Sequence, residues 1–403
     1  MEYLRTAAGL LLSVLLAAGG SAAAGTASIP YGDQPIDVGP ATVTARVPQG
    51  YVLELLVSGL GAPRIATFAA NGDLFLGSRS GNIYRLQPPY TKAQVVVRLD
   101  GYPHSVAFRN GEMLIARTDG LYRAPYAPGQ ATIDPREVSL LAPLPAGRGH
   151  NSRTVAVGPD GRVYLSLGIS GNCSDQYLGG DYPFEDRRGG VMVLVEEGGK
   201  ARWEPFAAGL RNPVGFDWRP GTAVLYASNN GPDHWGYDLP PEVFSRLDPG
   251  SFQGMPWFQF DGREVRRDSC VRSDPPRPLA EVSRPEATFP ARNAPMGVAF
   301  VDDARLGADW QGDAVVALHG SWGTEPDGGA SGDPASRRPP KLVLVRFDGD
   351  HAARVDDLVT GFQLENGARW GRPVGVAVGP DGALYFTSDA GINGLFRLRK
   401  AEP

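Results

Sequence analysis

A short phrase recurs along this chain: a proline, an apolar segment, a turn that contains glycine, and a second apolar segment. It is clearest over residues 372–387, where RPVGVAV is followed by GPDG and then by ALYFT. Aligning the copies places five prolines in one column and a serine in the sixth place: Pro63, Pro103, Ser152, Pro213, Pro295 and Pro373. Only 36 of the 403 residues are proline, so this column is far from chance and the repeat is real.

Each copy predicts a β-hairpin, because strand-forming residues flank a turn whose glycine accepts a positive φ. The turns are Asn71-Gly72, Asn110-Gly111, Asp160-Gly161 and Asp381-Gly382. Most copies are followed by a second apolar pair, which makes four strands per unit. Repeated four-stranded units predict an all-β fold, a six-bladed β-propeller of four-stranded antiparallel blades. A β-sandwich or jelly roll would not explain a phrase repeated six times.

The remaining length of the fourth and fifth units is expected in loops, over 232–291 and 323–340, and helices should be minor. The domain division expected is a secretory signal peptide over 1–24, an N-terminal segment over 25–50 and the propeller, a catalytic domain, over 51–403. The signal is indicated by Arg5, an apolar run and the small residues up to Ala24. That run is shorter than a membrane anchor needs, so a periplasmic or secreted protein with no stable membrane anchor is expected.

Charge and cysteine content narrow the environment further. The formal net charge of −5 and the pI near 5.6 give no basic footprint, so nucleic acid is excluded as a partner. Cys173 and Cys270 are expected to form a disulfide in an oxidising compartment. Spacing alone leaves the alternative of two free thiols open.

Matching positions of a radial repeat converge on the axis, and here they carry polar and basic side chains. The two residues before the proline column and the one after it include His150, Asn151, Arg211, Asn212, Arg372, Arg64, His104 and Arg153. Such residues predict a positively charged axial pocket for a small anion, because arginine suits carboxylate or phosphate. A water-filled channel lined by polar residues is the alternative. His150, in a Gly-Arg-Gly-His-Asn loop, is a candidate general base, and His351 is expected on the surface.

The segment 229–242 is a second candidate region. Turn carbonyls and nearby carboxylates would suit a hard cation such as Ca²⁺, although an ordinary loop has the same composition and the EF-hand spacing is absent. No GxGxxG, zinc-type or GxSxG motif is present, which disfavours nicotinamide, zinc and serine-hydrolase chemistry.

At this point the sequence resembles a known family. GLRNPVG over 209–215, LYASNNGPD over 225–233 and DLPPE over 238–242 resemble the soluble quinoprotein sugar dehydrogenases and sorbosone dehydrogenases. The third and last units do so too, and the resemblance extends over about 51–399. It implies a periplasmic six-bladed propeller that binds pyrroloquinoline quinone (PQQ) and Ca²⁺ on its axis.

The resemblance also implies roles for single residues. His150 matches the base that takes a proton from the substrate hydroxyl, and Arg211 matches the arginine beside the reactive quinone carbonyl. Asn212 matches its neighbour in the cofactor pocket. Gly231 and Pro232 match the pair whose main-chain carbonyls hold the Ca²⁺.

The carboxylates of the cofactor should meet Arg372, with Lys341 as a second cation and Trp322 as an aromatic wall. Arg64, from the axial column, joins these cofactor-binding candidates. Trp370 stands where relatives have a further arginine, and His234-Trp235 stands where they have an acidic residue, which leaves a second, structural calcium open.

The expected function is a quinoprotein oxidoreductase that oxidises an aldose, sugar aldehyde or polyol. Because no haem CxxCH motif is present, electrons should pass to a separate acceptor. Two alternatives remain: a calcium-dependent lactonase, which would need acidic metal ligands on the axis, and a ligand-binding propeller without enzyme activity.

Overall fold

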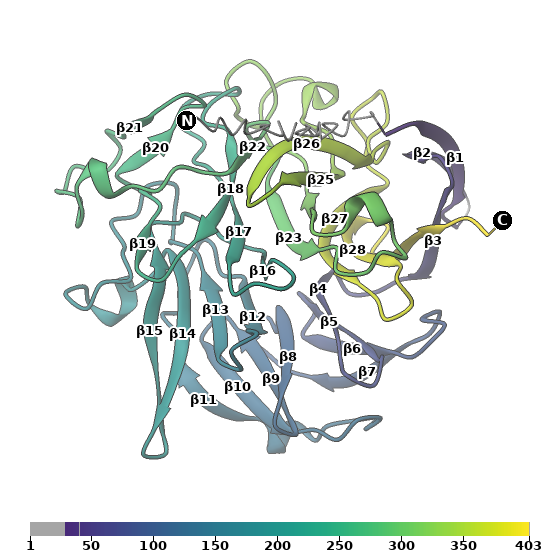
Figure 1. The fold of residues 1–403 in the computed structure, drawn as a ribbon, viewed down its shortest axis with the longest axis horizontal. Helices are drawn as coiled ribbons and strands as arrows, with labels where there is room; N and C mark the ends of the chain where they lie inside the picture. The colour runs from purple at the N-terminus through teal and green to yellow at the C-terminus, as the bar shows by residue number, and fades with distance from the viewer. Residues whose placement is uncertain (1–28, 40, 403) are drawn as a thin grey trace, which may run out of the picture.

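The chain forms a ring of six β-sheets around a central axis (Figure 1). The computed structural model describes residues 29–39 and 41–402. Each sheet has four antiparallel strands in a row, and the third carries one further short strand, β19 (Ser251–Phe252), in parallel. The predicted six-bladed β-propeller is therefore confirmed. The predicted signal peptide, residues 1–24, lies outside the described residues.

The first three blades follow the chain without interruption. Their strands, from the axis outward, are β4 (Pro63–Phe68), β5 (Leu74–Ser78), β6 (Asn82–Leu86) and β7 (Ala93–Arg98), then β8 (Ser105–Arg109), β9 (Glu112–Arg117), β10 (Gly120–Pro125) and β11 (Ser139–Pro143), then β12 (Arg153–Val157), β13 (Val163–Leu167), β14 (Gly190–Glu197) and β15 (Lys200–Ala208).

The last three blades carry the insertions and close the ring. Their strands are β16 (Phe216–Trp218), β17 (Leu225–Asn229), β18 (Glu242–Leu247) and β22 (Ala287–Phe289), then β23 (Pro295–Phe300), β24 (Ala314–Leu318), β25 (Lys341–Asp348) and β26 (His351–Val359), then β27 (Gly371–Val378), β28 (Leu384–Gly391), β29 (Gly394–Lys400) and β3 (Tyr51–Ser58).

The sixth blade joins the two ends of the propeller. Its outermost strand, β3, precedes the first blade in sequence and pairs antiparallel with β29, with Leu53 opposite Leu398. Strand β3 lies beside the C-terminal strand in Figure 1. This pairing covers an edge that would otherwise be exposed.

The hairpin turns confirm the sequence reading. Asn110 and Gly111 have φ of 53° and 76°, and Gly161 and Gly382 both have φ of 76°. Asparagine and glycine adopt this left-handed region at the lowest cost, so these residues fix the turns that join β8 to β9 and the corresponding strands of other blades.

The hydrophobic core lies between the blades. Between blades 2 and 3, for example, Leu114 and Leu121 pack with Leu165 and Met192. Each face of a blade is apolar and is buried only by its neighbour, at about 1.5–3 kcal/mol for each large side chain. Because every blade needs both neighbours, the ring fixes where each innermost strand meets the axis.

One expectation about the insertions is wrong in part. Residues 232–291 were expected as loop, but they contain β18 and β22, two outer strands of blade 4. The short apolar runs there are strands because they pair with β17 and with each other. The remainder of this segment includes β19 and a small hairpin of β20 (Phe258–Phe260) and β21 (Val265–Arg267).

The other elements are small. Before the propeller, β1 (Tyr31–Asp37) and β2 (Thr42–Pro48) form a hairpin, from which Ile36 and Val47 pack onto the core of blades 5 and 6. Helices in the described residues are single 3₁₀ turns: η1 (Pro135–Glu137), η2 (Phe184–Asp186), η3 (Leu279–Glu281), η4 (Ala308–Trp310) and η5 (Pro334–Ser336).

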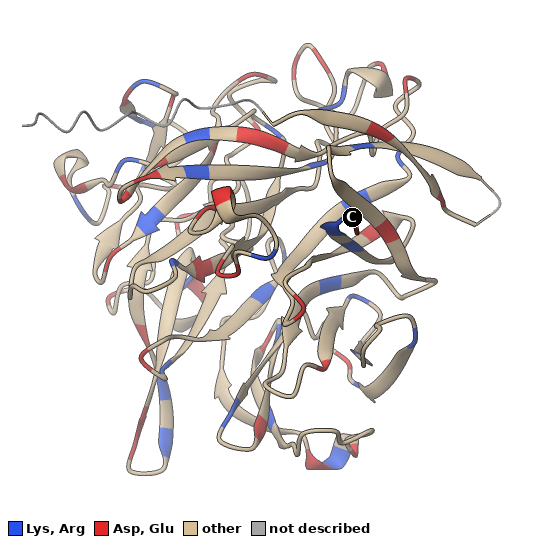
Figure 2. Ribbon diagram, turned by 45° about the vertical axis from the view of Figure 1, so that its right-hand side comes forward, with Lys and Arg blue, Asp and Glu red and all other residues tan. Residues whose placement is uncertain are grey.

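In the view of Figure 2, acidic and basic residues are interspersed over the blades. Over the part of the chain that the structure describes, no helix has the length and apolar character needed to cross a membrane.

Candidate functional site

The proline-column residues meet on one ring around the axis, as predicted. The Ile65 N–H donates to the carbonyl of His104, and Ser105 Oγ donates to that of Arg153 at 2.8 Å. Thr154 Oγ1 donates to the carbonyl of Val214, and hydroxyl groups of blades 4 and 6 donate in the same way to the carbonyls of Met296 and Arg64. The six residues that directly follow the column positions are buried and form a floor across the axis: Arg64, His104, Arg153, Val214, Met296 and Val374.

His104 belongs to this floor. It is fully buried, its Nδ1 lies 3.1 Å from the Arg153 carbonyl, and burial and then the charge of Arg64 hold its pKa well below the usual value. His104 is therefore a neutral structural residue.

The loop that carries His150 is fixed from below by two buried arginines. Arg188 Nη2 and Arg153 Nη1 each donate to the His150 carbonyl at 2.9 Å. Arg188 Nε also donates to the carbonyl of Gly168 at 2.8 Å. These contacts hold the backbone of a glycine-rich loop in one position above the floor.

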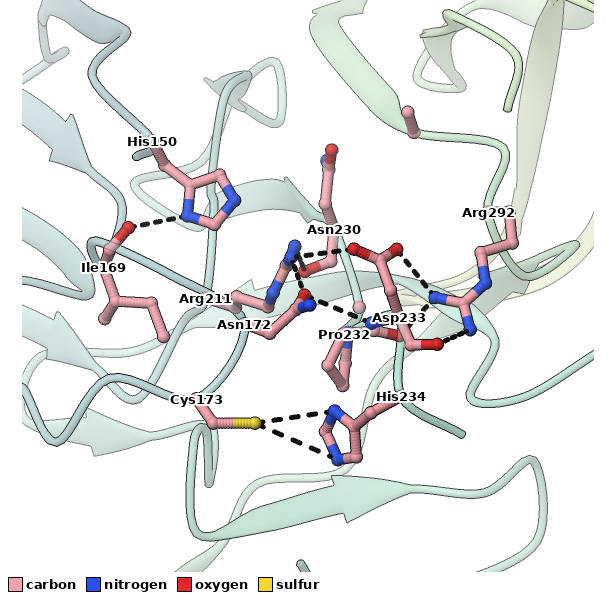
Figure 3. Close-up of polar contacts among 12 residues, drawn as sticks. His150, Ile169, Asn172, Cys173, Arg211, Asn230, Pro232, Asp233, His234 and Arg292 are labelled. Atoms are coloured by element: carbon pink, nitrogen blue, oxygen red, sulfur yellow. Dashed lines mark hydrogen bonds and ion pairs between the residues drawn. The ribbon is translucent and has the colours of Figure 1, made fainter. Parts of the chain in front are cut away.

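The imidazole of His150 is oriented as a base. Its Nδ1 lies 2.6 Å from the Ile169 carbonyl (Figure 3), so Nδ1 carries the proton and Nε2 keeps its lone pair. Burial, followed by the positive charge of Arg211, lowers the pKa of His150 to about 3. The imidazole is therefore neutral at physiological pH and able to accept a proton.

Arg211 and Asn212, which lie at the start of blade 4, pack close to His150. A methyl group added to Gly168 would lie 2.6 Å from His150 Cβ, 2.9 Å from Asn212 Oδ1 and 3.0 Å from the Arg211 carbonyl. Because Gly168 has no side chain, the segment that carries His150 can pack against the segment that carries Arg211 and Asn212. The sequence predicted this grouping of His150, Arg211 and Asn212.

The guanidinium of Arg211 is held by several partners (Figure 3). Nη2 donates to Asn172 Oδ1 and lies 3.6 Å from Asp233 Oδ2, and Nη1 lies 3.4 Å from the Asn230 carbonyl. Asn172 Oδ1 also accepts from the Asp233 N–H at 3.2 Å. A buried positive charge is therefore fixed beside the imidazole.

The loop after Pro232 is organised by a second buried arginine, Arg292. Its side chain is 3% exposed, Nη1 donates to the Pro232 carbonyl at 2.5 Å, and it pairs with Asp233 Oδ1 at 2.8 Å. Its Nη2 donates to three further carbonyls, those of Asp233, Gly236 and Leu239. A guanidinium thus lies where the carbonyl oxygens of this loop converge.

Glu242 connects this loop to blade 5. Its Oε2 accepts from the Gly231 N–H at 2.5 Å and its Oε1 from the Ala294 N–H at 3.3 Å. Burial raises the pKa of Glu242 to about 7, against the opposing effect of these N–H groups and of Arg211 and Arg292.

A cluster of arginines lies on the blade 5 to blade 1 side of the axis. Arg64 pairs with Asp389, whose other oxygen lies 2.6 Å from His319 Nε2. Arg372 Nε and Nη2 donate to the carbonyls of His319 and Gly320, both at 2.9 Å. The charges of this set act on one another: Arg64, Arg79, Arg337, Arg369 and Arg372, which we call the basic cluster.

The basic cluster carries an excess of positive charge. Burial lowers the pKa of Arg372 to about 10 together with the charges of Arg64, Arg337 and Arg79, against the opposing effect of Asp389. Arg369 is affected in the same way, with a pKa of about 10. Burial and the Arg64 and Arg372 charges affect His319 too, whose pKa falls to about 4 despite Asp389. Such a set favours a bound anion.

Main-chain contacts join the basic cluster to the His150 side. The N–H groups of His319 and Gly320 donate to the carbonyls of Ala294 and Asn293, both at 3.0 Å, and the Ala294 N–H reaches Glu242. Asn293 is 1% exposed, and its Oδ1 has no hydrogen-bond partner within the chain. An unpaired buried acceptor of this kind is a point where a ligand donor can bind.

Two predicted cofactor residues lie at the margin. Trp322, two residues beyond Gly320, is 54% exposed. Lys341 does not join the basic cluster, because its Nζ pairs at 2.5 Å with Asp357 of the outer strand β26. Trp370, which replaces a family arginine, is buried and donates through Nε1 to the Gly361 carbonyl.

Several functional residues were not singled out from the sequence. Asn172, Arg188, Arg292 and Asp389 each hold a predicted residue or its loop, but none lies in the proline column. The column of residues two before the proline did contain Asn293, next to Arg292, and that position was the available signal.

Solved structures share this architecture. The calcium structure of a Trichoderma reesei carbohydrate-active enzyme of family AA12 aligns with a TM-score of 0.73 and 16% identity, over 93% of this chain and 99% of that chain. The holo PQQ domain of pyranose dehydrogenase from Coprinopsis cinerea aligns with a TM-score of 0.65 and 21% identity, over 89% of this chain and 97% of that one. The chain shares their fold.

A third neighbour is the PQQ-bound aldose sugar dehydrogenase of Streptomyces coelicolor, with a TM-score of 0.57 and 16% identity, over 88% of this chain and 99% of that one. The chain shares the fold of this neighbour as well. By sequence, an uncharacterized protein of Borreliella burgdorferi is 23% identical over 374 residues, which is 89% of this chain and 91% of that protein. No family model matches the chain.

Proposed function

We propose that this protein is a PQQ-dependent dehydrogenase that oxidises a hydroxyl group of an aldose, a hydrated sugar aldehyde or a related polyol. The observation that carries the proposal is the neutral imidazole of His150, fixed beside the Arg211 guanidinium and joined to the axial floor through Arg153. The PQQ-containing neighbours with this fold support it. We propose export to the periplasm from the sequence of residues 1–24.

The basic cluster fits the carboxylates of PQQ. The positive charges of five arginines repel one another there. Asp389 is an acidic residue of this region, and it already forms an ion pair with Arg64. Arginine binds carboxylate through paired N–H donors, so a tricarboxylate would satisfy this excess charge. The exposed ring of Trp322 and the unpaired Asn293 Oδ1 add a stacking surface and a polar contact.

The chemistry divides between cofactor and chain. PQQ, when bound, supplies the acceptor for the hydride that leaves the substrate carbon. His150 Nε2 takes the proton of the substrate hydroxyl, and Nδ1–H donated to Ile169 keeps the ring in the required tautomer. Arg211 holds a fixed positive charge beside the reacting atoms, where negative charge develops. Repeated turnover would require a separate electron acceptor.

Calcium at Gly231 and Pro232 does not fit the residues present. The Pro232 carbonyl already accepts from Arg292, whose guanidinium is surrounded by four main-chain carbonyls of this loop. A divalent ion beside that guanidinium would be repelled. We therefore expect Arg292 to supply the local positive charge, and we assign no catalytic step to calcium.

The lactonase alternative needs acidic ligands on the axis. Within 29–39 and 41–402, the one group of three His, Cys, Asp or Glu residues close enough to share an ion is Cys173, His234 and Cys270. That group contains no carboxylate, so the site favours the quinone.

The decisive test is to mix the purified chain with PQQ and follow both the absorption of the bound cofactor and dye-linked oxidation of sugars. Saturable binding together with sugar-dependent dye reduction supports the proposal. Hydrolysis of lactones without PQQ would support the lactonase instead. If the chain binds no PQQ, oxidises no sugar and hydrolyses no lactone, the third alternative, a propeller without enzyme activity that binds another ligand, would be supported.

Replacing Arg372 by glutamine is expected to weaken PQQ binding about 10- to 100-fold, because one charge-assisted carboxylate contact is lost. Titration of protein fluorescence with PQQ measures it. Arg136→Gln is the matched control, because Arg136 is 89% exposed in η1 and should leave affinity unchanged. Equal affinity of the Arg372→Gln variant and the native chain would remove the basic cluster from cofactor binding.

The pH profile tests the state of His150. Because its pKa is lowered to about 3, the base form persists well below pH 6.5, and the acid limb of kcat/KM should lie below 6.5. Arg211→Gln removes one cause of the lowering, so any residual activity should show this limb at higher pH. An acid limb of the native kcat/KM profile at or above pH 6.5 would contradict the lowered pKa of His150.

A further inference from the structure

A second cluster of reactive side chains lies beside the axial site (Figure 3). Cys173 and Cys270 form a disulfide with Cα atoms 5.8 Å apart, which confirms the predicted pairing. It joins the loop after β13 to the insertion after β21. Both cysteines are only partly buried, so small molecules can reach them.

His234 is held against this disulfide. Its Nδ1 lies 3.5 Å from Cys173 Sγ, and its Nε2 lies 2.9 and 3.0 Å from the two oxygens of Asp268. Asp268 is 1% exposed and also accepts from the Cys270 N–H at 2.9 Å. A buried carboxylate therefore fixes the imidazole beside the sulfur, which lies 3.5 Å from Nδ1 and 4.0 Å from Nε2.

We propose that, when the disulfide is reduced, Cys173, Cys270 and His234 bind one Zn²⁺-like divalent ion. One ligand atom from each of the three residues lies within 4.8 Å of the others. Two thiolates and one imidazole form a donor set that zinc prefers, with a fourth position left for water. This proposal rests on the cluster alone and not on the proposed dehydrogenase activity.

The contact with Asp268 is the second observation that points to a metal. Histidines that bind metals commonly donate their other ring N–H to a carboxylate, which fixes the tautomer and makes the ligand nitrogen more basic. Here Nε2–H donates to Asp268, and Nδ1 lies 3.5 Å from the sulfur. The imidazole is thus already held beside the sulfur while the disulfide is intact.

The metal site requires prior reduction of the disulfide between Cys173 and Cys270. A trialkylphosphine and one water convert the disulfide into two thiols and a phosphine oxide, a two-electron reduction. Binding of the ion then releases the two thiol protons, and His234 binds as the neutral ring. Oxidation to the disulfide removes both sulfur ligands, so the site exists in one redox state only.

The experiment uses Co²⁺, which reports thiolate ligands by absorption. The full chain, oxidised or reduced under nitrogen with a trialkylphosphine, is titrated with CoCl₂, and ZnCl₂ is then added in competition. We expect one Co²⁺ per reduced chain, thiolate-to-cobalt charge-transfer bands, displacement by Zn²⁺ and none of this in the oxidised chain. Equal binding by both forms, or none by the reduced form, would overturn the proposal.

Variants separate the ligands from the fold. Asp268→Asn keeps the side-chain shape and should weaken the binding of Co²⁺ about 10- to 100-fold, as loss of an outer carboxylate does. His234→Ala should lose the tetrahedral spectrum, and His351→Ala, at the exposed start of β26, should bind like the native chain. The far-UV circular dichroism of each reduced protein is recorded alongside. A native chain whose spectrum collapses on reduction also contradicts the proposal, because the three ligands come from separate loops.

Discussion

Replacement of His150 by alanine is expected to lower kcat/KM for sugar oxidation about 1,000-fold, within the range that general-base catalysis contributes. The native imidazole keeps Nε2 unprotonated and held in place through Ile169, and alanine has no group to accept the substrate proton. PQQ affinity should stay within about threefold of native, since the carboxylates of the cofactor meet the basic cluster instead. Dye-linked kinetics and PQQ titration measure the two effects separately.

Two further variants show whether His150 acts chemically or only structurally. Asparagine at position 150 can still donate an N–H toward the Ile169 carbonyl but has no basic nitrogen, so His150→Asn should be as inactive as His150→Ala. His351→Ala is the matched control, because that side chain is 79% exposed at the start of β26. Recovery of activity in His150→Asn to within about tenfold of native would make His150 a positioning residue and not the base.

The fold could be predicted because its determinants are local and repeated. Each blade has its own hairpin turn, such as Asn110-Gly111, and the proline column lies within three residues of the start of each innermost strand. Rotational symmetry then places equivalent residues on one ring, which is why His150, Arg211 and Asn212 could be grouped before any coordinates were known. The exception is 232–291, where strand pairing, and not composition, decides what is loop.

The ion pairs of the site were harder to predict, because they join residues that the repeat does not relate. Arg64 and Asp389 are 325 positions apart, and Arg292 reaches back 60 positions to the Pro232 carbonyl. Nothing local in either segment indicates its partner. For Lys341 the prediction relied on the local sequence alone. The neighbouring strand supplies Asp357, and the ammonium group of Lys341 pairs with it instead of joining the basic cluster.

The contact between Arg292 and the Pro232 carbonyl bears on whether this chain needs calcium. The native chain, treated with a chelator, is expected to bind PQQ with an affinity within about threefold of that measured with added Ca²⁺, because the Arg292 guanidinium already supplies charge at Pro232. Arg292→Met keeps bulk but removes the charge and its five oxygen contacts. In chelator it should bind PQQ about 10- to 100-fold more weakly, the order of effect expected when a buried charge partner is removed.

Added Ca²⁺ discriminates the two accounts of this loop. In Arg292→Met the carbonyls of Pro232, Asp233, Gly236 and Leu239 lose their donor, so Ca²⁺ should restore part of the affinity there and have no effect on the native chain. Arg292→Lys, which keeps one charge but not the paired geometry, should lie between them. Thermal unfolding of each variant confirms that a folded protein is compared. A native chain that loses PQQ in chelator and regains it with Ca²⁺ would show that the ion displaces Arg292 from the Pro232 carbonyl, and would return this loop to the metal site that the sequence first indicated.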